Sequence, residues 1–175
     1  MTTDPRYPIG KVQLVEYSEK EKEARLADIL FLPRMLEYAV LNLDEKQIQT
    51  PYRDGGWTTH QLVHHLADSH MNAFIRFKLA LTEDNPVIKP YDEDKWSRLS
   101  DVSEVPINVS ITLLHSLHHR WHTLLESMSE QDLKRTLFHP EKQRNISLWE
   151  MLLIYAWHGK HHVAHITSLR ELNGW

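Results

Sequence analysis

The chain has 175 residues, of which 20 are basic and 24 acidic, and its formal charge is −4. A chain of this length can bury a substantial core, and we predict a single domain over residues 1–175. The acidic balance argues against nucleic acid as a partner. No apolar run approaches the roughly 18 residues needed to cross a bilayer, and the N-terminal MTTDPRYPIGK lacks a signal-peptide core. We therefore expect a cytoplasmic protein with no membrane partner.

Histidine and cysteine are the compositional outliers, because the chain has 13 histidines and no cysteine. The absence of cysteine excludes a disulfide, a thiolate nucleophile and cysteine-bound zinc. Any metal would therefore be held by imidazole, alone or with carboxylate, and this ligand set suits zinc, nickel, copper or iron.

Four long segments repeat apolar residues at helical spacing, and the chain has only five glycines. In chain order the segments are 18–43, 58–81, 106–128 and 147–173. Four amphipathic helices of this length in one domain predict an all-α four-helix bundle.

Polar residues mark where these helices begin. Capping-box pairs are expected at three helix starts, and they are Ser18 with Glu21, Thr58 with Gln61, and Ser147 with Glu150. Pro106 suits the first position of the third helix. Pro33 lies inside the first helix and predicts a kink or a local break there.

The connections between the helices give two weaker expectations. Helices one and three are each followed by a short turn, a polar loop, a capping box and a histidine-bearing helix, so the chain shows a weak internal repeat. Two similar helix pairs related by a pseudo-twofold axis would bring helices two and four together. Segment 82–105 is too long for a tight turn. It either covers one mouth of the bundle or is an ordered crossover without chemistry, since long connections in compact domains are usually functional or specifically packed.

The fourth helix carries the densest histidine cluster, in the stretch WHGKHHVAHI. Residues four apart share a helix face, which pairs His158 with His162 and His161 with His165. On a helical wheel the first pair lies nearer the apolar face, and the second lies further round. Two imidazoles one turn apart are a common half of a metal site, and buried or boundary histidines with other partners are an equally weighted interpretation.

Two further clusters lie on helices two and three. In HQLVHHLADSH the wheel does not separate His64 from His65, so one of them is the natural third ligand and the other is expected to be a solvated flank residue. The cluster HSLHHRWH, at residues 115–122, has no evident facing histidine, and we attribute it to surface polarity. His139 is expected to be a loop residue that either approaches the site or, as we favour, has no role in it.

Five blocks along the chain resemble one known family. YPIGK, TPYRDGGWT, HHLADSHMN, RFKLALTE and WHGKHHVAHI are similar to the YfiT-like branch of the DinB/YfiT superfamily, and the resemblance covers nearly the whole chain. It implies an up-down-down-up four-helix bundle with long crossover loops, assembled as a homodimer. It also implies one divalent metal per chain, zinc or nickel, held by three histidines. The family's ligand positions correspond to His65, His158 and His162, which include the pair favoured by the wheel.

Three protein ligands leave at least one position of a metal open, which favours a catalytic site over a structural one. A water in that position is acidified toward a pKa of about 7, and the ion can polarise a carbonyl. The resemblance implies a metal-dependent hydrolase that acts on a small molecule of unknown identity. Asp68, one turn after His65, is interpreted as a proton acceptor, as a residue that orients a ligand, or as a solvated helix residue.

Two other functions stay open. The wider superfamily includes thiol S-transferases that use bacillithiol, mycothiol or glutathione, and in these the open position would bind the thiol as thiolate. The third possibility is a non-enzymatic helical dimer in which the metal serves stability or sensing. Metal removal would then lower the melting temperature strongly, and no small molecule would enter the open position.

Overall fold

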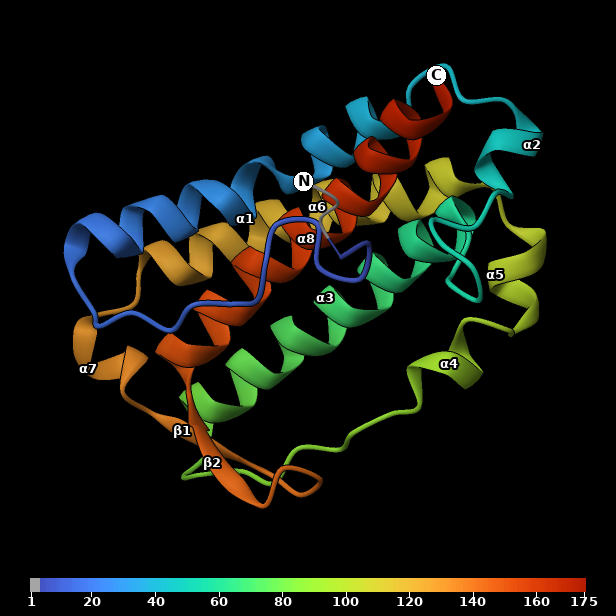
Figure 1. Cartoon of the computed structure of the whole chain (residues 1–175). Coiled ribbons are helices and arrows are strands. Elements are labelled where there is room, and N and C mark those ends of the chain that lie inside the picture. Colours follow the sequence, from blue (N-terminus) through green and yellow to red (C-terminus); the bar gives the residue numbers. More distant parts are fainter. Residues whose placement is uncertain (1–3) are drawn as a thin grey trace.

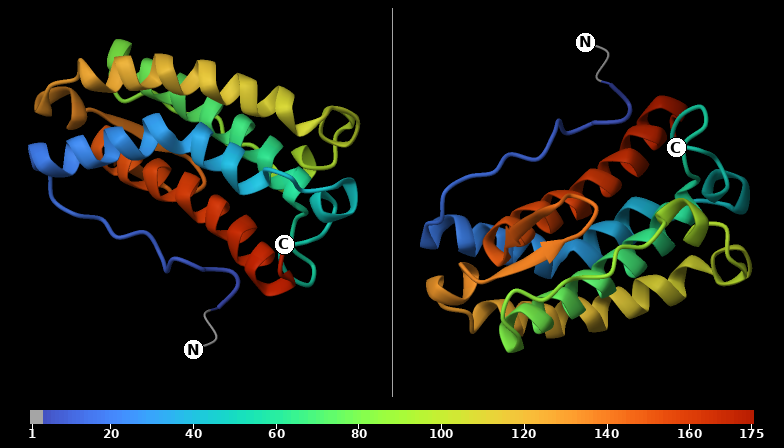
Figure 2. Two further views of the ribbon diagram at one scale, coloured as in Figure 1. Left: turned by 90° about the horizontal axis from the view of Figure 1, so that it is seen from above. Right: turned by 90° about the horizontal axis from the view of Figure 1, so that it is seen from below.

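The computed structural model describes residues 4–175, and its four long helices form the predicted four-helix bundle (Figure 1). The long helices are α1 (Glu19–Val40), α3 (Thr59–Thr82), α6 (Ile107–Glu126) and α8 (Leu148–Asn173). Each packs against two others, with α1 and α3 both lying between α6 and α8. Helices α1 and α8 run in one direction and α3 and α6 in the other, so the up-down-down-up topology is confirmed (Figures 1 and 2).

Short elements connect the long helices. They are α2 (Glu45–Ile48), α4 (Glu93–Trp96), α5 (Ser100–Glu104), α7 (Glu130–Leu133), β1 (Thr136–His139) and β2 (Arg144–Ser147). Within residues 4–175, no helix has both the length and the apolar character that crossing a membrane requires.

The helix starts follow the predicted caps, with two differences. Ser18, Thr58 and Ser147 each accept a hydrogen bond from the backbone N–H three residues later. Of these three helix starts, only the one at Thr58 has a complete capping box, because the Gln61 side chain accepts from the Thr58 N–H. The Glu150 carboxylate pairs instead with Arg144 of β2. Pro106 is the N-cap of α6 and not its first helical residue.

Helix α1 continues through Pro33, so the alternative of a local break is wrong. Pro33 has no N–H and cannot donate to the carbonyl of Ile29, four residues earlier. The Nδ1 atom of His118, on the neighbouring helix α6, lies 2.6 Å from that carbonyl oxygen. A side chain from another helix therefore satisfies the acceptor that the proline leaves free, and Pro33 itself is buried.

The stretch 136–147, predicted as part of a polar loop, forms an antiparallel hairpin of β1 and β2. Strand β1 also binds the crossover segment after α3, since Phe138 N–H donates to the Pro86 carbonyl and Ile88 N–H donates to the Phe138 carbonyl. The hairpin and the crossover thus lie side by side along one face of the bundle, as two views show (Figures 1 and 2).

The core consists of two apolar clusters separated along the bundle by a layer of histidines. On α8 the first cluster ends at Ala156 and the second begins at Val163. Helices α3 and α6 show the same interruption, between Ala67 and Ala73 and between Leu114 and Trp121. We define the histidine layer as His65, His70, His118, His158 and His162. The last four lie within this interval, and His65 lies two residues before Ala67 at its edge.

Gly159 lets α8 approach α1 closely at the level of the histidine layer. A Cβ atom at this position would lie 2.5 Å from Cδ2 of Leu32, which is itself buried on α1. Any larger residue would push the two helices apart or displace Leu32 from the core. The glycine therefore fixes the position of the two histidine-bearing turns that flank it.

Candidate metal centre

Three imidazoles from two helices converge on one point. His65 comes from α3, and His158 and His162 come from successive turns of α8. The Nε2 atom of His158 lies 3.2 Å from Nε2 of His65 and 3.1 Å from Nε2 of His162. The three residues offer nitrogen atoms that all lie within 4.8 Å of one another, an arrangement that can hold a metal ion.

The donor set fits a divalent metal better than it fits hydrogen bonding among the rings alone. A neutral imidazole nitrogen carries either one hydrogen or one lone pair. His158 Nε2 can therefore form one good hydrogen bond, yet it has two nitrogen neighbours at hydrogen-bond distance. Two imidazole nitrogens bound at about 2.05 Å to one tetrahedral ion lie about 3.3 Å apart, which is close to both distances.

Burial keeps these rings in the neutral form that metal binding requires. Desolvation lowers the pKa of His65 to about 4. The pKa values of His158 and His162 lie well below the usual value, first through desolvation and then through the other histidines around them. Since a metal binds deprotonated imidazole, the site is ready for a cation at neutral pH.

Trp57 and Asp94 connect the site to the crossover segment. The indole of Trp57 packs against the ring of His65, with their centroids 4.6 Å apart. Its Nε1–H donates to the Asp94 carboxylate in α4 at 3.1 Å. The crossover segment therefore reaches the neighbourhood of His65.

His118 corrects the prediction that the cluster at 115–122 reflects surface polarity. Its side chain is buried, with 1% exposed, and the facing histidine that the sequence did not reveal is His70 on α3. His70 Nδ1 lies 2.9 Å from His118 Nε2, and His70 Nε2 lies 3.1 Å from His158 Nδ1. The signal was present in the sequence, because position 118 is four residues after Leu114 and three before Trp121 and so belongs to the apolar stripe of α6.

The expectation that the neighbour of His65 is solvated is also wrong. His64 is buried, and both of its ring nitrogens have partners. Nδ1 lies 2.8 Å from the Ser110 hydroxyl and Nε2 lies 3.0 Å from the Val105 carbonyl. His64 therefore joins α3 to the start of α6, and its ring points away from the converging trio.

The second pair on α8, His161 and His165, is buried as well. His165 stacks on Tyr52 with centroids 4.0 Å apart, and its Nδ1 lies 3.3 Å from Nδ1 of His162. Together with His162 the pair forms a second group that can hold a metal. The helical wheel placed this pair further from the apolar face than His158 and His162. The pair is buried nevertheless, because Tyr7 and Tyr52, which lie outside the long helices, pack against His161 and His165.

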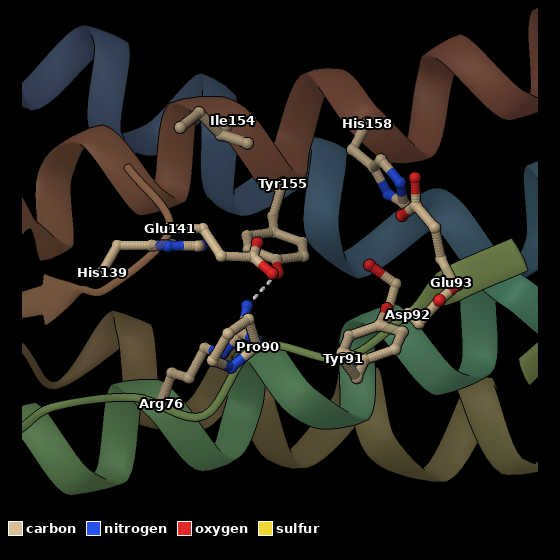
Figure 3. A pocket seen from close by; sticks show the side chains of 11 residues that line it. Arg76, Pro90, Tyr91, Asp92, Glu93, His139, Glu141, Ile154, Tyr155 and His158 are labelled. Atoms are coloured by element: carbon tan, nitrogen blue, oxygen red, sulfur yellow. Dashed lines mark hydrogen bonds between the residues drawn. The ribbon is translucent and has the colours of Figure 1, made fainter. Parts of the chain in front are cut away.

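A cavity of about 360 Å³ opens beside His158 (Figure 3). His158 and Glu93 lie at one end of it, Arg76 and His139 lie at the other, and Tyr155 lies between them. Arg76 Nη1 donates to the Tyr155 hydroxyl at 3.3 Å. His139 ends β1 and does not lie in a loop, and it lines the cavity, in agreement with the alternative in which it approaches the site.

Glu93 is the carboxylate that sequence reasoning missed. It lines the cavity beside His158 and also a second cavity of about 340 Å³ that is bounded by His162 and Trp57. Desolvation, followed by the nearby carboxylates of Asp94 and Asp92, raises the pKa of Glu93 above its usual value. Glu93 lies in the crossover, and no helical period relates it to the histidines.

Asp68 occupies a different environment from Glu93. Desolvation, with a smaller contribution from Asp101, raises its pKa to about 6. Its carboxylate does not line either cavity, and within residues 4–175 it forms no hydrogen bond or ion pair. Its role as a proton acceptor stays a prediction.

The fold and the site together define a class, namely four-helix-bundle proteins in which three histidines from two helices form a group able to hold a metal. The family model of the DinB superfamily matches residues 29–166. The chain belongs to this superfamily, as its sequence blocks indicated.

Close relatives agree with this placement. A protein of Bacillus mycoides (strain KBAB4) named "Putative metal-dependent hydrolase" is 51% identical over 173 residues, which cover 98% of this chain and 99% of the relative. A protein of Oceanobacillus iheyensis with the same description is 50% identical over 171 residues, covering 97% and 98%.

Solved structures show the same fold. YfiT from Bacillus subtilis, described as "a probable metal-dependent hydrolase with an unusual four-helix bundle topology", superposes with a TM-score of 0.96 at 45% identity and covers 99% of both chains. A mycothiol-dependent maleylpyruvate isomerase superposes with a TM-score of 0.66 at 15% identity, covering 86% of this chain and 63% of the other. The second likeness shows the fold alone.

Proposed function

We propose that this protein is a metal-dependent hydrolase that holds one divalent ion, zinc or nickel, through His65, His158 and His162 and acts on a small molecule. The observation that carries the proposal is the convergence of three imidazoles on one point, beside a cavity that His158 lines. The names of the close relatives support the reaction class.

The chain supplies most of what a hydrolytic reaction needs at this site. When bound, the metal contributes a Lewis acid that polarises a substrate carbonyl and acidifies water. The trio supplies three ligands, which leaves room for substrate or water. Glu93 points toward His158 in the cavity, and its raised pKa suits a base that accepts a proton from the attacking water (Figure 3). Arg76 and Tyr155 offer donors to the far end of a bound substrate.

Metal analysis of purified variants tests the ligand assignment. We expect about one equivalent of zinc or nickel in the wild type and a loss of stoichiometric metal in His65→Ala, His158→Ala and His162→Ala. His115→Ala and His119→Ala are matched controls, because both side chains are exposed on α6, and they retain metal. Metal retained in the first three variants and lost in His161→Ala and His165→Ala would assign the ion to the second group.

Activity measurements separate the hydrolase from the thiol transferase. An open position beside a cavity also suits a thiolate, so both reactions must be offered to the loaded enzyme. Electrophiles such as p-nitrophenyl acetate and an epoxide are supplied with water only and then with a low-molecular-weight thiol. Hydrolysis in water supports the proposal, and thiol adducts without hydrolysis would replace it. Strong metal-dependent stability with neither reaction would favour a non-enzymatic, metal-stabilised protein.

We also propose that the protein forms a homodimer. Helix α1 exposes Phe31, Met35 and Tyr38 along one face, and this apolar surface is available to a second copy of the chain. Light scattering or sedimentation equilibrium measures the mass directly. A monomer at micromolar concentration would contradict the proposal.

A further inference from the structure

His70 and His118 lie behind the candidate ligand His158, and among residues 4–175 they belong to neither of the groups able to hold a metal. The planes of the two rings are tilted by only 20° and their centroids lie 5.0 Å apart, which suits an edge-to-edge hydrogen bond, and both side chains are buried in the bundle. They form a continuous series of contacts that starts at a backbone carbonyl of α1 and ends at His158. The contacts are Ile29 O to His118 Nδ1 at 2.6 Å, His118 Nε2 to His70 Nδ1 at 2.9 Å, and His70 Nε2 to His158 Nδ1 at 3.1 Å.

The carbonyl at the start of this series gives every hydrogen bond in it a direction. A carbonyl oxygen can only accept, so His118 carries its hydrogen on Nδ1. A neutral imidazole has one N–H, and therefore His118 Nε2 is an acceptor and His70 donates from Nδ1. By the same step His70 Nε2 accepts from His158 Nδ1–H. The remaining nitrogen of His158, Nε2, then carries a lone pair and faces His65 and His162.

Pro33 explains why a helical carbonyl is available to start the series. In an uninterrupted helix the amide of residue 33 would donate to the carbonyl of residue 29. Proline has no amide hydrogen, so the Ile29 oxygen is free for His118. The proline inside α1, which looked like a helix breaker in the sequence, thus frees the acceptor on which the histidine series depends.

We propose that His70 and His118 are positioning residues that hold His158 in the tautomer with a lone pair on Nε2, aimed at the point shared with His65 and His162. The use of that lone pair by a metal rests on the function proposed above, whereas the order of the hydrogen bonds does not. A ligand histidine commonly donates its second N–H to a carboxylate, a carbonyl or water, and this orients the ring. In this chain the carbonyl that fixes the hydrogen-bond direction does not contact His158 itself. Two neutral imidazoles, His118 and His70, link it to His158 and add no charge to the core.

Nitrogen NMR on the metal-free protein tests the hydrogen-bond order directly. Long-range ¹H–¹⁵N correlation spectra distinguish the two neutral tautomers by the shifts of the ring nitrogens, and single His→Gln variants assign the signals. We expect Nδ1–H for His118, His70 and His158. An Nε2–H tautomer at any of the three overturns the proposal, whether or not the protein proves to be a hydrolase.

Two variants of His118 then test its effect on the ligand. Glutamine can donate to Ile29 O and accept from His70, whereas methionine fills a similar volume and can do neither. We expect His118→Met to weaken Co²⁺ binding by about 10–100-fold and to change the visible Co²⁺ spectrum, and His118→Gln to recover most of both. Circular dichroism confirms that both variants are folded.

The outcomes separate this proposal from the proposed function. Equal Co²⁺ affinity and an unchanged spectrum in folded wild type and His118→Met would overturn the positioning role. A wild type that binds no Co²⁺ would instead remove the metal site, and the NMR result would still decide the hydrogen-bond order.

Discussion

The ring of His158 is held by a residue of another helix, because His70 on α3 lies 3.1 Å from the ring nitrogen that faces away from His65 and His162. The candidate ligand is thus fixed on both sides, by the other two imidazoles and by the series that ends at Ile29. Three of the four long helices contribute side chains to this arrangement, and α1 contributes its carbonyl. The geometry of the centre and the packing of the bundle are therefore coupled.

Metal removal is expected to lower the melting temperature of the wild type. An ion present at 100 times its dissociation constant stabilises the folded state by about 2.7 kcal/mol, which corresponds to a shift of about 5–10 °C for a chain of this size. Differential scanning calorimetry with and without a chelator measures the shift. His65→Ala is the control, since it should show no chelator effect. An equal shift in that variant would place the stabilising ion elsewhere.

The metal-free protein should lose stability as the pH falls from 6.5 toward 4. Desolvation lowers the pKa of His118 from 6.5 to about 4 in the folded state, so between these values the unfolded chain binds a proton that the folded chain does not. The stability lost through this residue is about 3 kcal/mol and is complete below pH 4. Urea unfolding at several pH values measures it. His118→Met should show a shallower decline, and an identical pH profile in both proteins would contradict the prediction.

Glu93→Gln should lower turnover without removing the metal. Glu93 lines the cavity but is not one of the three converging histidines, so its replacement removes the proposed proton acceptor and leaves the proposed ligands in place. We expect kcat for p-nitrophenyl acetate hydrolysis to fall about 100-fold or more at unchanged metal content. Asp68→Asn is the matched variant, because it removes the other carboxylate with a raised pKa. If Asp68→Asn shows the larger loss, the base is Asp68.

Gly159→Ala should destabilise the protein although alanine is the better helix former. The added methyl would meet Leu32 at 2.5 Å, and overpacking of this kind costs about 1–3 kcal/mol against a gain of about 1 kcal/mol in helix propensity. In a Leu32→Ala background the clash is gone, and the same substitution should then stabilise. Urea unfolding of the four proteins in this cycle gives the coupling, and additive effects would refute a contact between the two positions.

Much of the bundle could be predicted from the sequence, because helix starts and apolar periodicity are local signals. Ser18, Thr58 and Ser147 cap the helices as expected, and the last long helix ends where Gly174 takes a left-handed conformation with φ of 69°. The same periodicity favoured His158 and His162 over the other pair on α8. Resemblance to a family, and not the wheel, distinguished His65 from His64.

The remaining features depend on contacts between segments far apart in the sequence. His118 looked like one polar residue among several on α6, and its partners His70 and Ile29 lie on two other helices. The wheel placed His64 at the edge of the apolar stripe but could not show that Ser110 covers it. Glu93 lies in the crossover, and backbone hydrogen bonds to β1 fix the path of this segment. Neither the crossover nor the hairpin has a helical period, so the sequence pattern does not reveal the position of Glu93.

The converging histidines and part of the cavity wall come from two different kinds of segment. The converging histidines lie on long, tightly packed helices, whereas Glu93, His139 and part of the cavity wall come from the crossover and the hairpin. Substitutions in these connections can change the shape of the cavity without altering the interhelical packing that holds the imidazoles. The shape of the cavity can therefore change through residues 83–105 and 136–147 while the histidine layer stays in place, and efforts to alter what the cavity accepts should begin with these two segments.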